Sequence, residues 1–179
     1  MNNFREISPY ELAENPMKMI GKDWMLVSAA KETDGEVFGK DYNTMTASWG
    51  GVGVLWNRPV AFVFIRPERH TYLFTEDSDT MTLSFFSSEW REALTFCGRN
   101  SGRDVDKAEN CGLTPVFAKD NGKRSVYFDE ASCVMTLRKM YADSLETSHF
   151  CDEAPLEFYR TDGLHKMYVC EITSVLVRE

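Results

Sequence analysis

The chain has 179 residues, of which 43% are hydrophobic and 13% aromatic, so it can bury a core without disulfides or a structural metal. Its formal net charge of −8 argues against a general nucleic-acid-binding protein, which would present a basic face. No apolar run approaches the roughly 18 residues of a membrane-spanning helix. We therefore expect a single domain over residues 1–179 that binds neither nucleic acid nor membrane.

The cysteines indicate a reducing compartment. There are five, at Cys97, Cys111, Cys133, Cys151 and Cys170, an odd number with no CxxC pair. With only three scattered His, they do not match the spacing of a zinc site, so we predict no metal. The N-terminus lacks the basic and apolar segments of a signal peptide. Reduced thiols in a cytoplasmic protein are the expectation.

The first 21 residues predict a short N-terminal helical extension. Residues 8–20 contain Pro9 and Pro16 and predict one or two helical turns that end at Gly21. After it come strand-like runs at Trp24–Ala30 and Val37–Met45, with a turn at Asp34-Gly35 between them.

The middle of the chain contains the clearest strand. Gly50, Gly51 and Gly53 predict a flexible loop, and the β-branched and aromatic run Val60–Ile65 predicts a strand buried on both faces. Residues 68–76 are compatible with helix or loop. A further strand is expected at Met81–Phe86.

One helix is expected from Ser88 to about Phe96, capped by Ser87 and followed by Gly98. Its apolar face consists of Trp90, Ala93, Leu94 and Cys97. Beyond it we expect a polar loop at residues 100–107 and an irregular or extended stretch at 112–117. An Asn121-Gly122 hairpin turn and strands at Ser125–Phe128, Ala131–Met140 and Met167–Val177 complete the pattern. Residues 143–153 give no clear signal.

Several strands, one helix and no regular strand–helix alternation favour a mostly β or α+β domain. No GxGxxG motif follows a strand, and the glycines at Gly50–Gly53 have the wrong spacing for a dinucleotide fold. Any nicotinamide would have to bind without a Rossmann domain.

Three polar segments carry residue types suited to a phosphorylated ligand. Asn43–Trp49 supplies hydroxyls and backbone amides around an aromatic, or is simply a strand edge. Arg66–Thr71 offers two guanidinium forks that match phosphate oxygens, or is a solvated turn. Ser101–Lys107 combines a hydroxyl, a permissive glycine and two cations, although Asp104 and Asp106 partly cancel that charge and leave a surface loop as the alternative.

The order of these segments resembles the flavin reductase family, specifically its flavoredoxin-like branch. The string NTMTASWGGVGVLWNRPVAFVFIRPERHTY is followed by TLSFF, CGRNSGRDVDK and GLTP, and His165 precedes the final strand. The match covers roughly residues 24–115 and the last strand. It is weak before residue 21 and across residues 117–161.

The resemblance implies an FMN-binding split barrel, an antiparallel Greek-key β-barrel with a few short helices. It implies FMN as cofactor, NAD(P)H as electron donor, and a homodimer with the flavin near the subunit interface. The first segment would lie beside the ring and ribityl chain, the second and third at the phosphate. The implied cofactor-binding residues are Asn43, Thr44, Met45, Thr46, Ala47, Ser48, Trp49, Arg66, Arg69, Thr71, Ser84, Phe85, Phe86, Ser101, Gly102, Arg103 and Lys107.

The implied function is an NAD(P)H-dependent flavin reductase, in which hydride passes from the nicotinamide to flavin N5 and the protein supplies orientation. His165 is the catalytic candidate, as a contact to flavin or nicotinamide or as a proton donor, and a packed histidine is the alternative. Cys97 and Cys111 flank the third segment as two buried thiols or, alternatively, as a redox-active pair.

Two other functions stay open. An FMN electron carrier would be reduced by a redox protein partner rather than by NAD(P)H, and its acidic surface would suit a basic partner. A barrel that binds no flavin is the third possibility, because fold does not fix function.

Overall fold

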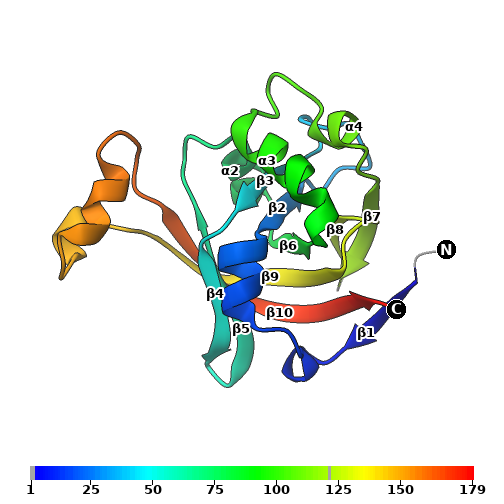
Figure 1. The fold of residues 1–179 in the computed structure, drawn as a ribbon, viewed down its shortest axis with the longest axis horizontal. Helices are drawn as coiled ribbons and strands as arrows, with labels where there is room; N and C mark the ends of the chain where they lie inside the picture. Colours follow the sequence, from blue (N-terminus) through cyan, green and yellow to red (C-terminus); the bar gives the residue numbers. More distant parts are fainter. Residues whose placement is uncertain (1–2, 121) are drawn as a thin grey trace.

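The computed structural model describes residues 3–120 and 122–179 and arranges them around one curved antiparallel sheet (Figure 1). Its strands are β1 (Phe4–Ile7), β2 (Met25–Ala30), β3 (Tyr42–Ala47), β4 (Gly50–Leu55), β5 (Arg58–Ile65), β6 (Thr80–Phe85), β9 (Cys133–Ser144) and β10 (Lys166–Arg178). A separate pair is formed by β7 (Pro115–Asp120) and β8 (Lys123–Phe128).

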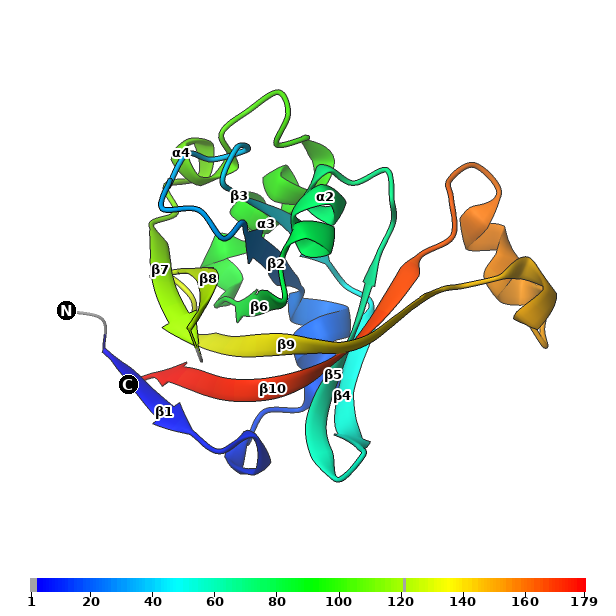
Figure 2. The same cartoon turned by 180° about the vertical axis from the view of Figure 1, so that it is seen from behind.

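The helices are short. They are α1 (Pro16–Lys18), α2 (His70–Asp77), α3 (Arg91–Arg99) and α4 (Lys107–Cys111), with 3-10 turns η1 (Pro9–Glu11), η3 (Ser88–Trp90), η4 (Thr147–His149) and η5 (Ala154–Tyr159) and a π-helical turn η2 (Met19–Asp23). Helices α2, α3 and α4 gather at one end of the barrel, and the β4–β5 hairpin lies at the other (Figures 1 and 2). None of the helices in the described ranges is long and apolar enough to cross a membrane.

The sheet order explains where the barrel is open. It runs β3-β2-β6-β9-β10-β5-β4, and β1 pairs with the far end of β10. The two outermost strands, β3 and β4, follow each other in the chain with only Ser48 and Trp49 between them. The chain therefore crosses from one edge of the sheet to the other at this point, and the barrel is split there.

The strand β4 corrects the expectation of a flexible glycine loop. Its six residues pair in register with β5, from Gly50 opposite Val63 to Leu55 opposite Arg58. The hairpin turns at Trp56-Asn57, where both φ values are positive (52° and 56°), as in the tight turns that match strand twist. A glycine-rich segment becomes a strand here because the neighbouring strand supplies its hydrogen bonds.

The core consists of two layers. Inside the barrel lie alternate residues of each strand, for example Met25, Val27 and Val63. Outside it, Leu26 of β2 packs beneath α3, α4 and the β7–β8 pair. Strands β2 and β6 are thus buried on both faces. On β5 the expectation of burial on both faces is wrong, because Phe62 and Phe64 are only half-buried.

Between β9 and β10 the chain makes a long excursion, residues 145–165, which we call the arm. It stands out from the barrel in both views (Figures 1 and 2). It carries η4 and η5 and returns to the barrel where Leu145 N–H donates to the His165 carbonyl, at 2.9 Å. No clear sequence pattern predicted a structure for the first part of this segment.

Other differences concern the N-terminal third. The expected helical extension contains a strand, β1, because Phe4–Ile7 pairs with the end of β10. Gly21 does not end the helical turns, which continue to Asp23. No turn forms at Asp34-Gly35; the chain turns at Gly39, and β3 starts at Tyr42 rather than Val37.

The remaining differences follow α3. Gly98 lies inside that helix, which ends at Arg99, and the Ser87 hydroxyl donates to Glu89 instead of capping the turn that follows. The polar loop ends one residue early, because Lys107 begins a helix, α4, that was not expected. Of the predicted Asn121-Gly122 turn, the first residue lies outside the described ranges.

Candidate functional site

A hollow of about 320 Å³ lies at the split of the barrel, and we call it the aromatic hollow. This is within the range of about 300–1,000 Å³ that small-molecule sites occupy. It is lined by the end of β3, the crossing to β4, the end of β5 and the arm. The lining residues are Met45, Thr46, Ala47, Ser48, Trp49, Phe64, Arg66, Arg69, Asp162 and His165.

A second hollow of about 140 Å³ adjoins the first and shares Met45 and Arg69 with it. We call it the basic corner, because four of its side chains are cationic and one is anionic. Its lining residues are Met45, Glu68, Arg69, His70, Thr71, Arg99, Asn100, Ser101, Gly102, Arg103 and Lys107. The two hollows together contain members of all three polar segments predicted from the sequence.

Hydrogen bonds hold the three segments together. Asn43 Nδ2 donates to Thr71 Oγ1 at 3.3 Å and joins the first segment to the second. Lys107 Nζ donates to the Thr44 carbonyl at 2.8 Å and joins the third to the first. Arg69 donates to the Gly98 carbonyl at 3.0 Å and ties the second segment to the end of α3. The convergence expected from the family resemblance is present in this chain.

Lys107 is the most constrained cation of the basic corner. It is only 3% exposed, and its ammonium also donates to the Cys97 carbonyl at 2.8 Å. Burial, with a smaller effect from Arg69, lowers the pKa of Lys107 to about 8. Two of the three ammonium N–H groups thus bond carbonyls of the described residues, and the side chain lines the basic corner.

The end of α3 positions two cations at once. Its Cys97 and Gly98 carbonyls accept from Lys107 and Arg69 respectively, which satisfies carbonyl groups that a helix C-terminus leaves without intrahelical partners. Arg69, Arg99 and Arg103 are exposed. The corner therefore combines a buried ammonium with exposed guanidinium groups, a donor set suited to a phosphate.

The outer edge of β3 contributes backbone donors. The Thr44 carbonyl accepts from Lys107 and so faces away from β2. Because backbone groups alternate along a strand, we expect the N–H groups of Thr46 and Ser48 to face the same way, along the split. The Thr46 hydroxyl, however, donates to the Leu94 carbonyl, so it is not available as a donor to a ligand.

Aromatic rings close the other end of the hollow. Trp49 is 42% exposed and contacts Phe158 of the arm edge to face, with ring centroids 5.2 Å apart. It also lies 5.4 Å from the His165 ring, which in turn meets Phe64 at 6.4 Å. These rings offer apolar surface to a flat ligand beside the polar edge of β3.

His165 is a packed, neutral histidine at this wall. Its Nδ1 shares a hydrogen bond of 3.0 Å with the Tyr159 hydroxyl, and the residue is only 8% exposed. Burial, followed by the charges of Arg66 and Arg69, lowers the pKa of His165 to about 4. At neutral pH the ring is uncharged, which argues against the expected role of its charged form as a proton donor.

Arg66 serves the arm rather than the basic corner. Its guanidinium bonds the Asp162 carboxylate and donates to the Phe158 carbonyl, the latter at 2.8 Å. It also lies over the Tyr159 ring, 5.4 Å from the centroid. Arg66 was expected near the phosphate; it lines the aromatic hollow, not the basic corner, and fixes the arm against that hollow.

Strand β6 does not reach either hollow. Ser84, Phe85 and Phe86 were expected to lie against the flavin, but β6 runs through the middle of the sheet between β2 and β9. Phe85 packs inside the barrel, and Phe86 packs in the outer layer near Trp90. All three residues are buried within the sheet and its packing layers and therefore do not line the hollows at the split.

Two further expectations change in detail. Gly102 lines the basic corner and is also required for packing, because a Cβ there would lie 2.3 Å from Asn43 Oδ1. Asn43 and Thr44 are fully buried and act as supports, since neither lines a hollow with its side chain. Thr71, Ser101 and Arg103 do line the basic corner.

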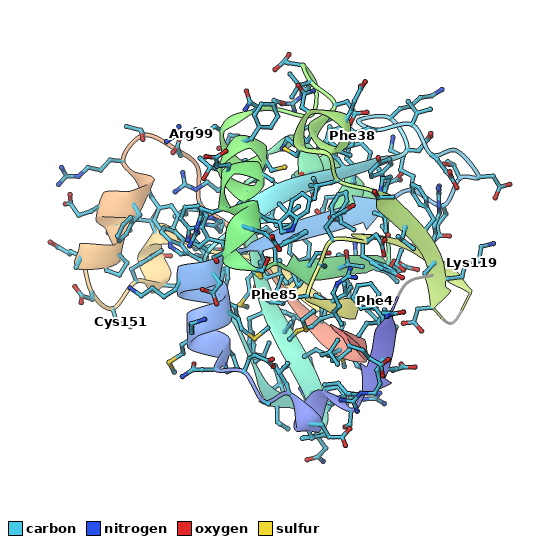
Figure 3. The ribbon with its side chains drawn as sticks, turned by 45° about the vertical axis from the view of Figure 1, so that its right-hand side comes forward. Phe4, Phe38, Phe85, Arg99, Lys119 and Cys151 are labelled. Carbon is cyan, nitrogen blue, oxygen red and sulfur yellow. The ribbon has the colours of Figure 1, made fainter. Side chains whose placement is uncertain are left out.

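Sequence reasoning missed six lining residues, two of which, Glu68 and His70, lie inside the second predicted segment. Phe64 was seen only as a strand residue, and Asp162 lies in the stretch where the resemblance is weak. Arg99 and Asn100 stand inside the quoted string CGRNSGRDVDK, so their adjacency to the third segment was a signal. Arg99 ends α3 on the side that faces the arm (Figure 3).

The fold is a split barrel with two adjoining hollows at the split, and comparison with known proteins assigns its family. The family model described as the flavin reductase like domain matches residues 17–179. The chain belongs to this family, which confirms the resemblance seen in the sequence.

Solved structures show the same fold at low identity. Flavoredoxin of Desulfovibrio vulgaris (Miyazaki F) is 20% identical with a TM-score of 0.65, over 97% of this chain and 78% of that one. An FMN-binding domain of a flavin reductases-like enzyme from Shewanella baltica is 15% identical, with a TM-score of 0.65 over 98% and 78%. Nitrilotriacetate monooxygenase component B from Bacillus cereus is also 15% identical, with a TM-score of 0.65 over 97% and 81%. No curated protein matches the chain.

Proposed function

We propose that the chain binds FMN across the aromatic hollow and the basic corner and acts as an NAD(P)H-dependent flavin oxidoreductase. The observation that carries the proposal is the continuity of the two hollows, which share Met45 and Arg69. Membership of the flavin reductase-like family supports it. FMN has a flat ring system at one end and a phosphate at the other. The ring matches the aromatic hollow, and the phosphate matches the cations of the basic corner.

The residues present fit FMN at each part. Trp49 and Phe64 give apolar surface for the ring, and the outer edge of β3 gives backbone donors beside it. Arg69, Arg103 and Lys107 suit the phosphate. Bound FMN would supply the redox chemistry, since hydride and electron transfer belong to the cofactor.

The chain's own part is to bind and orient. The arm, fixed by Arg66 to Asp162 and the Phe158 carbonyl, covers one side of the aromatic hollow and limits access of water. The neutral ring of His165 presents a packed surface and no positive charge beside the flavin. Orientation of two reactants in such a hollow provides much of the acceleration of their reaction.

We also propose that the working form is a homodimer with the flavin near the subunit interface. The aromatic hollow is open to solvent at Trp49, and Phe158 beside it is 60% exposed. Exposed aromatic surface next to a site is typical of protein contacts. Sedimentation of the FMN-loaded protein at the mass of two chains is expected; a monomer across micromolar concentrations would contradict this part.

The test of the activity is anaerobic stopped-flow spectroscopy of the FMN-loaded protein. Mixing with NADH or NADPH is expected to bleach the flavin absorption within seconds, faster than free FMN under the same conditions. Retention of oxidised flavin with both nucleotides would rule out the reductase.

A second candidate is an FMN electron carrier reduced by a protein partner. The net charge of −8 favours it, because an acidic surface attracts basic redox proteins, and flavoredoxin is among the similar structures. The same stopped-flow experiment separates the two: a carrier would be reduced quickly by a reduced ferredoxin-like protein and slowly by either nucleotide.

A further inference from the structure

The helices that build the basic corner carry two reduced cysteines side by side. Cys97 of α3 and Cys111 of α4 have their sulfur atoms 3.9 Å apart. We propose that they form a reversible disulfide that clamps α4 onto α3 and so fixes the loop that lines the basic corner. This inference adds a redox control to the proposed function and rests on it only for the effect on FMN.

The local structure permits the bond. A disulfide requires a sulfur–sulfur distance of about 2.05 Å, so the two side chains must approach by roughly 2 Å. Helix α4 has only five residues, between the polar loop 100–106 and Gly112, which has a φ of 66°. The first turn of α4 is held to the sheet, because Lys107 donates to the Thr44 carbonyl and Ala108 packs in the outer layer. Cys111 is at the other end of this short helix, next to the loop at Gly112, and there the chain can shift toward α3.

The surroundings favour the disulfide thermodynamically and slow its formation. Burial raises the pKa of Cys97 to about 12, and burial also raises the pKa of Cys111. Because little thiolate is present, these cysteines react slowly. A cysteine pair is strongly oxidising when its thiolate is stabilised, since this stabilises the reduced form. Here the thiolate is not stabilised, which favours the disulfide. Cys111 is only partly buried and is the sulfur that an oxidant can reach.

The reaction needs an oxidant, which we take to be a small-molecule disulfide. The Cys111 thiolate attacks one sulfur of that disulfide, which breaks its S–S bond, forms a mixed disulfide and releases one thiol. The Cys97 thiolate then attacks the Cys111 sulfur and releases the second thiol. The two cysteines lose two electrons, the small disulfide gains them, and the two cysteine protons leave with the released thiols.

The bond would act on the corner through the chain between the two cysteines. That segment contains six residues of the corner's lining, which are Arg99, Asn100, Ser101, Gly102, Arg103 and Lys107. Lys107 is tied to the pair directly, because its ammonium donates to the Cys97 carbonyl. Closing this loop with a covalent bond removes disorder that a ligand would otherwise have to remove on binding, so the oxidised form should hold an anion more tightly.

The first experiment tests the bond without FMN. The Cys151→Ser variant, which lacks the exposed thiol, is incubated with oxidised glutathione and examined by intact mass and peptide mapping. The expected result is the loss of two hydrogen atoms, one peptide linking Cys97 to Cys111, and a thermal midpoint higher by about 5 °C. Adding Cys111→Ser should abolish all three effects. A stable glutathione adduct, a different link or no reaction would overturn the proposal.

The second experiment measures the consequence. FMN is titrated into the oxidised and reduced Cys151→Ser protein, with the Cys111→Ser double variant as control. We expect oxidation to lower the Kd for FMN by about threefold to tenfold in the Cys151→Ser protein. In the double variant we expect the same Kd before and after treatment with the oxidant. Equal FMN affinity in the oxidised and reduced Cys151→Ser protein would overturn the proposal that the disulfide regulates binding at the basic corner. If neither form binds FMN, the proposed function fails, while the disulfide still stands or falls on the first experiment.

Discussion

At the scale of single residues, the site depends on a buried ammonium. Lys107 gives up hydration to donate to the Thr44 and Cys97 carbonyls, and this burial lowers its pKa to about 8. A phosphate dianion beside it would favour the charged form. Ligand binding and protonation of this one group are therefore linked.

That linkage predicts the pH dependence of FMN affinity. Below pH 8 the Lys107 ammonium is already charged, whereas above pH 8 FMN must bind together with a proton, so affinity should fall as the pH rises from 8 to 10. Lys107→Ala should bind about 10- to 100-fold more weakly at pH 7 and lose this dependence. Quenching of FMN fluorescence measures both, and wild-type affinity that stays flat up to pH 10 would contradict the assignment.

His165 makes a second, independent prediction. Its pKa is about 4 in the folded chain against about 6.5 when unfolded. Between these values only the unfolded chain takes up the proton, so folding stability falls as the pH falls from 6.5 to 4. We expect the free energy of unfolding of His165→Gln to fall less over this pH range than that of the wild type, by on the order of 1–3 kcal/mol. Urea unfolding at pH 7 and pH 4.5 checks it, and an unchanged pH slope in the variant would refute it.

At the scale of elements, β4 owes its position to a glycine. Gly50 has a φ of 153°, and a Cβ there would lie 2.8 Å from the Phe62 carbonyl oxygen. Gly50→Ala should therefore destabilise the chain by about 1–3 kcal/mol. Gly51→Ala is the matched control, because its nearest neighbour would be 3.9 Å away. Urea midpoints that shift equally in the two variants would show that β4 tolerates this crowding.

The arm is a second element with a definable anchor. Asp162 bonds the Arg66 guanidinium, whose side chain is only 16% exposed. We expect Asp162→Asn to speed hydrogen exchange across residues 145–165 and to change global stability by no more than about 1 kcal/mol. Glu157→Gln breaks an exposed pair inside the arm and is the control. Unchanged exchange in the arm of Asp162→Asn would mean that its packing on Trp49, not the ion pair, holds it.

At the scale of the whole molecule, the sequence predicted what local patterns determine. The runs at β6 and β10 alternate or are rich in β-branched residues, so both strands were predicted. The sequence contains signals for the helix α4 that our prediction did not use. Asp106 caps it by accepting from Glu109 N–H, and Gly112 ends it. The strand β4 was missed because glycines hide its pattern, and only pairing with β5 makes it a strand.

The site was predictable where its parts are contiguous and not where partners are distant. The three polar segments and their meeting were anticipated. The ion pair between Arg66 and Asp162 joins residues 96 positions apart, and no rule of sequence spacing predicts such a distant pair. The placement of Ser84–Phe86 failed for another reason, because an alternating strand does not say whether it lies at the edge or in the middle of a sheet.

Calorimetric titration of the purified chain with FMN and with riboflavin most directly tests whether three separated segments build one flavin-phosphate site. The expected result is one FMN bound per chain, with riboflavin, which lacks the phosphate, bound at least about tenfold more weakly. Absence of FMN binding, or equal affinity for the two flavins, would contradict it.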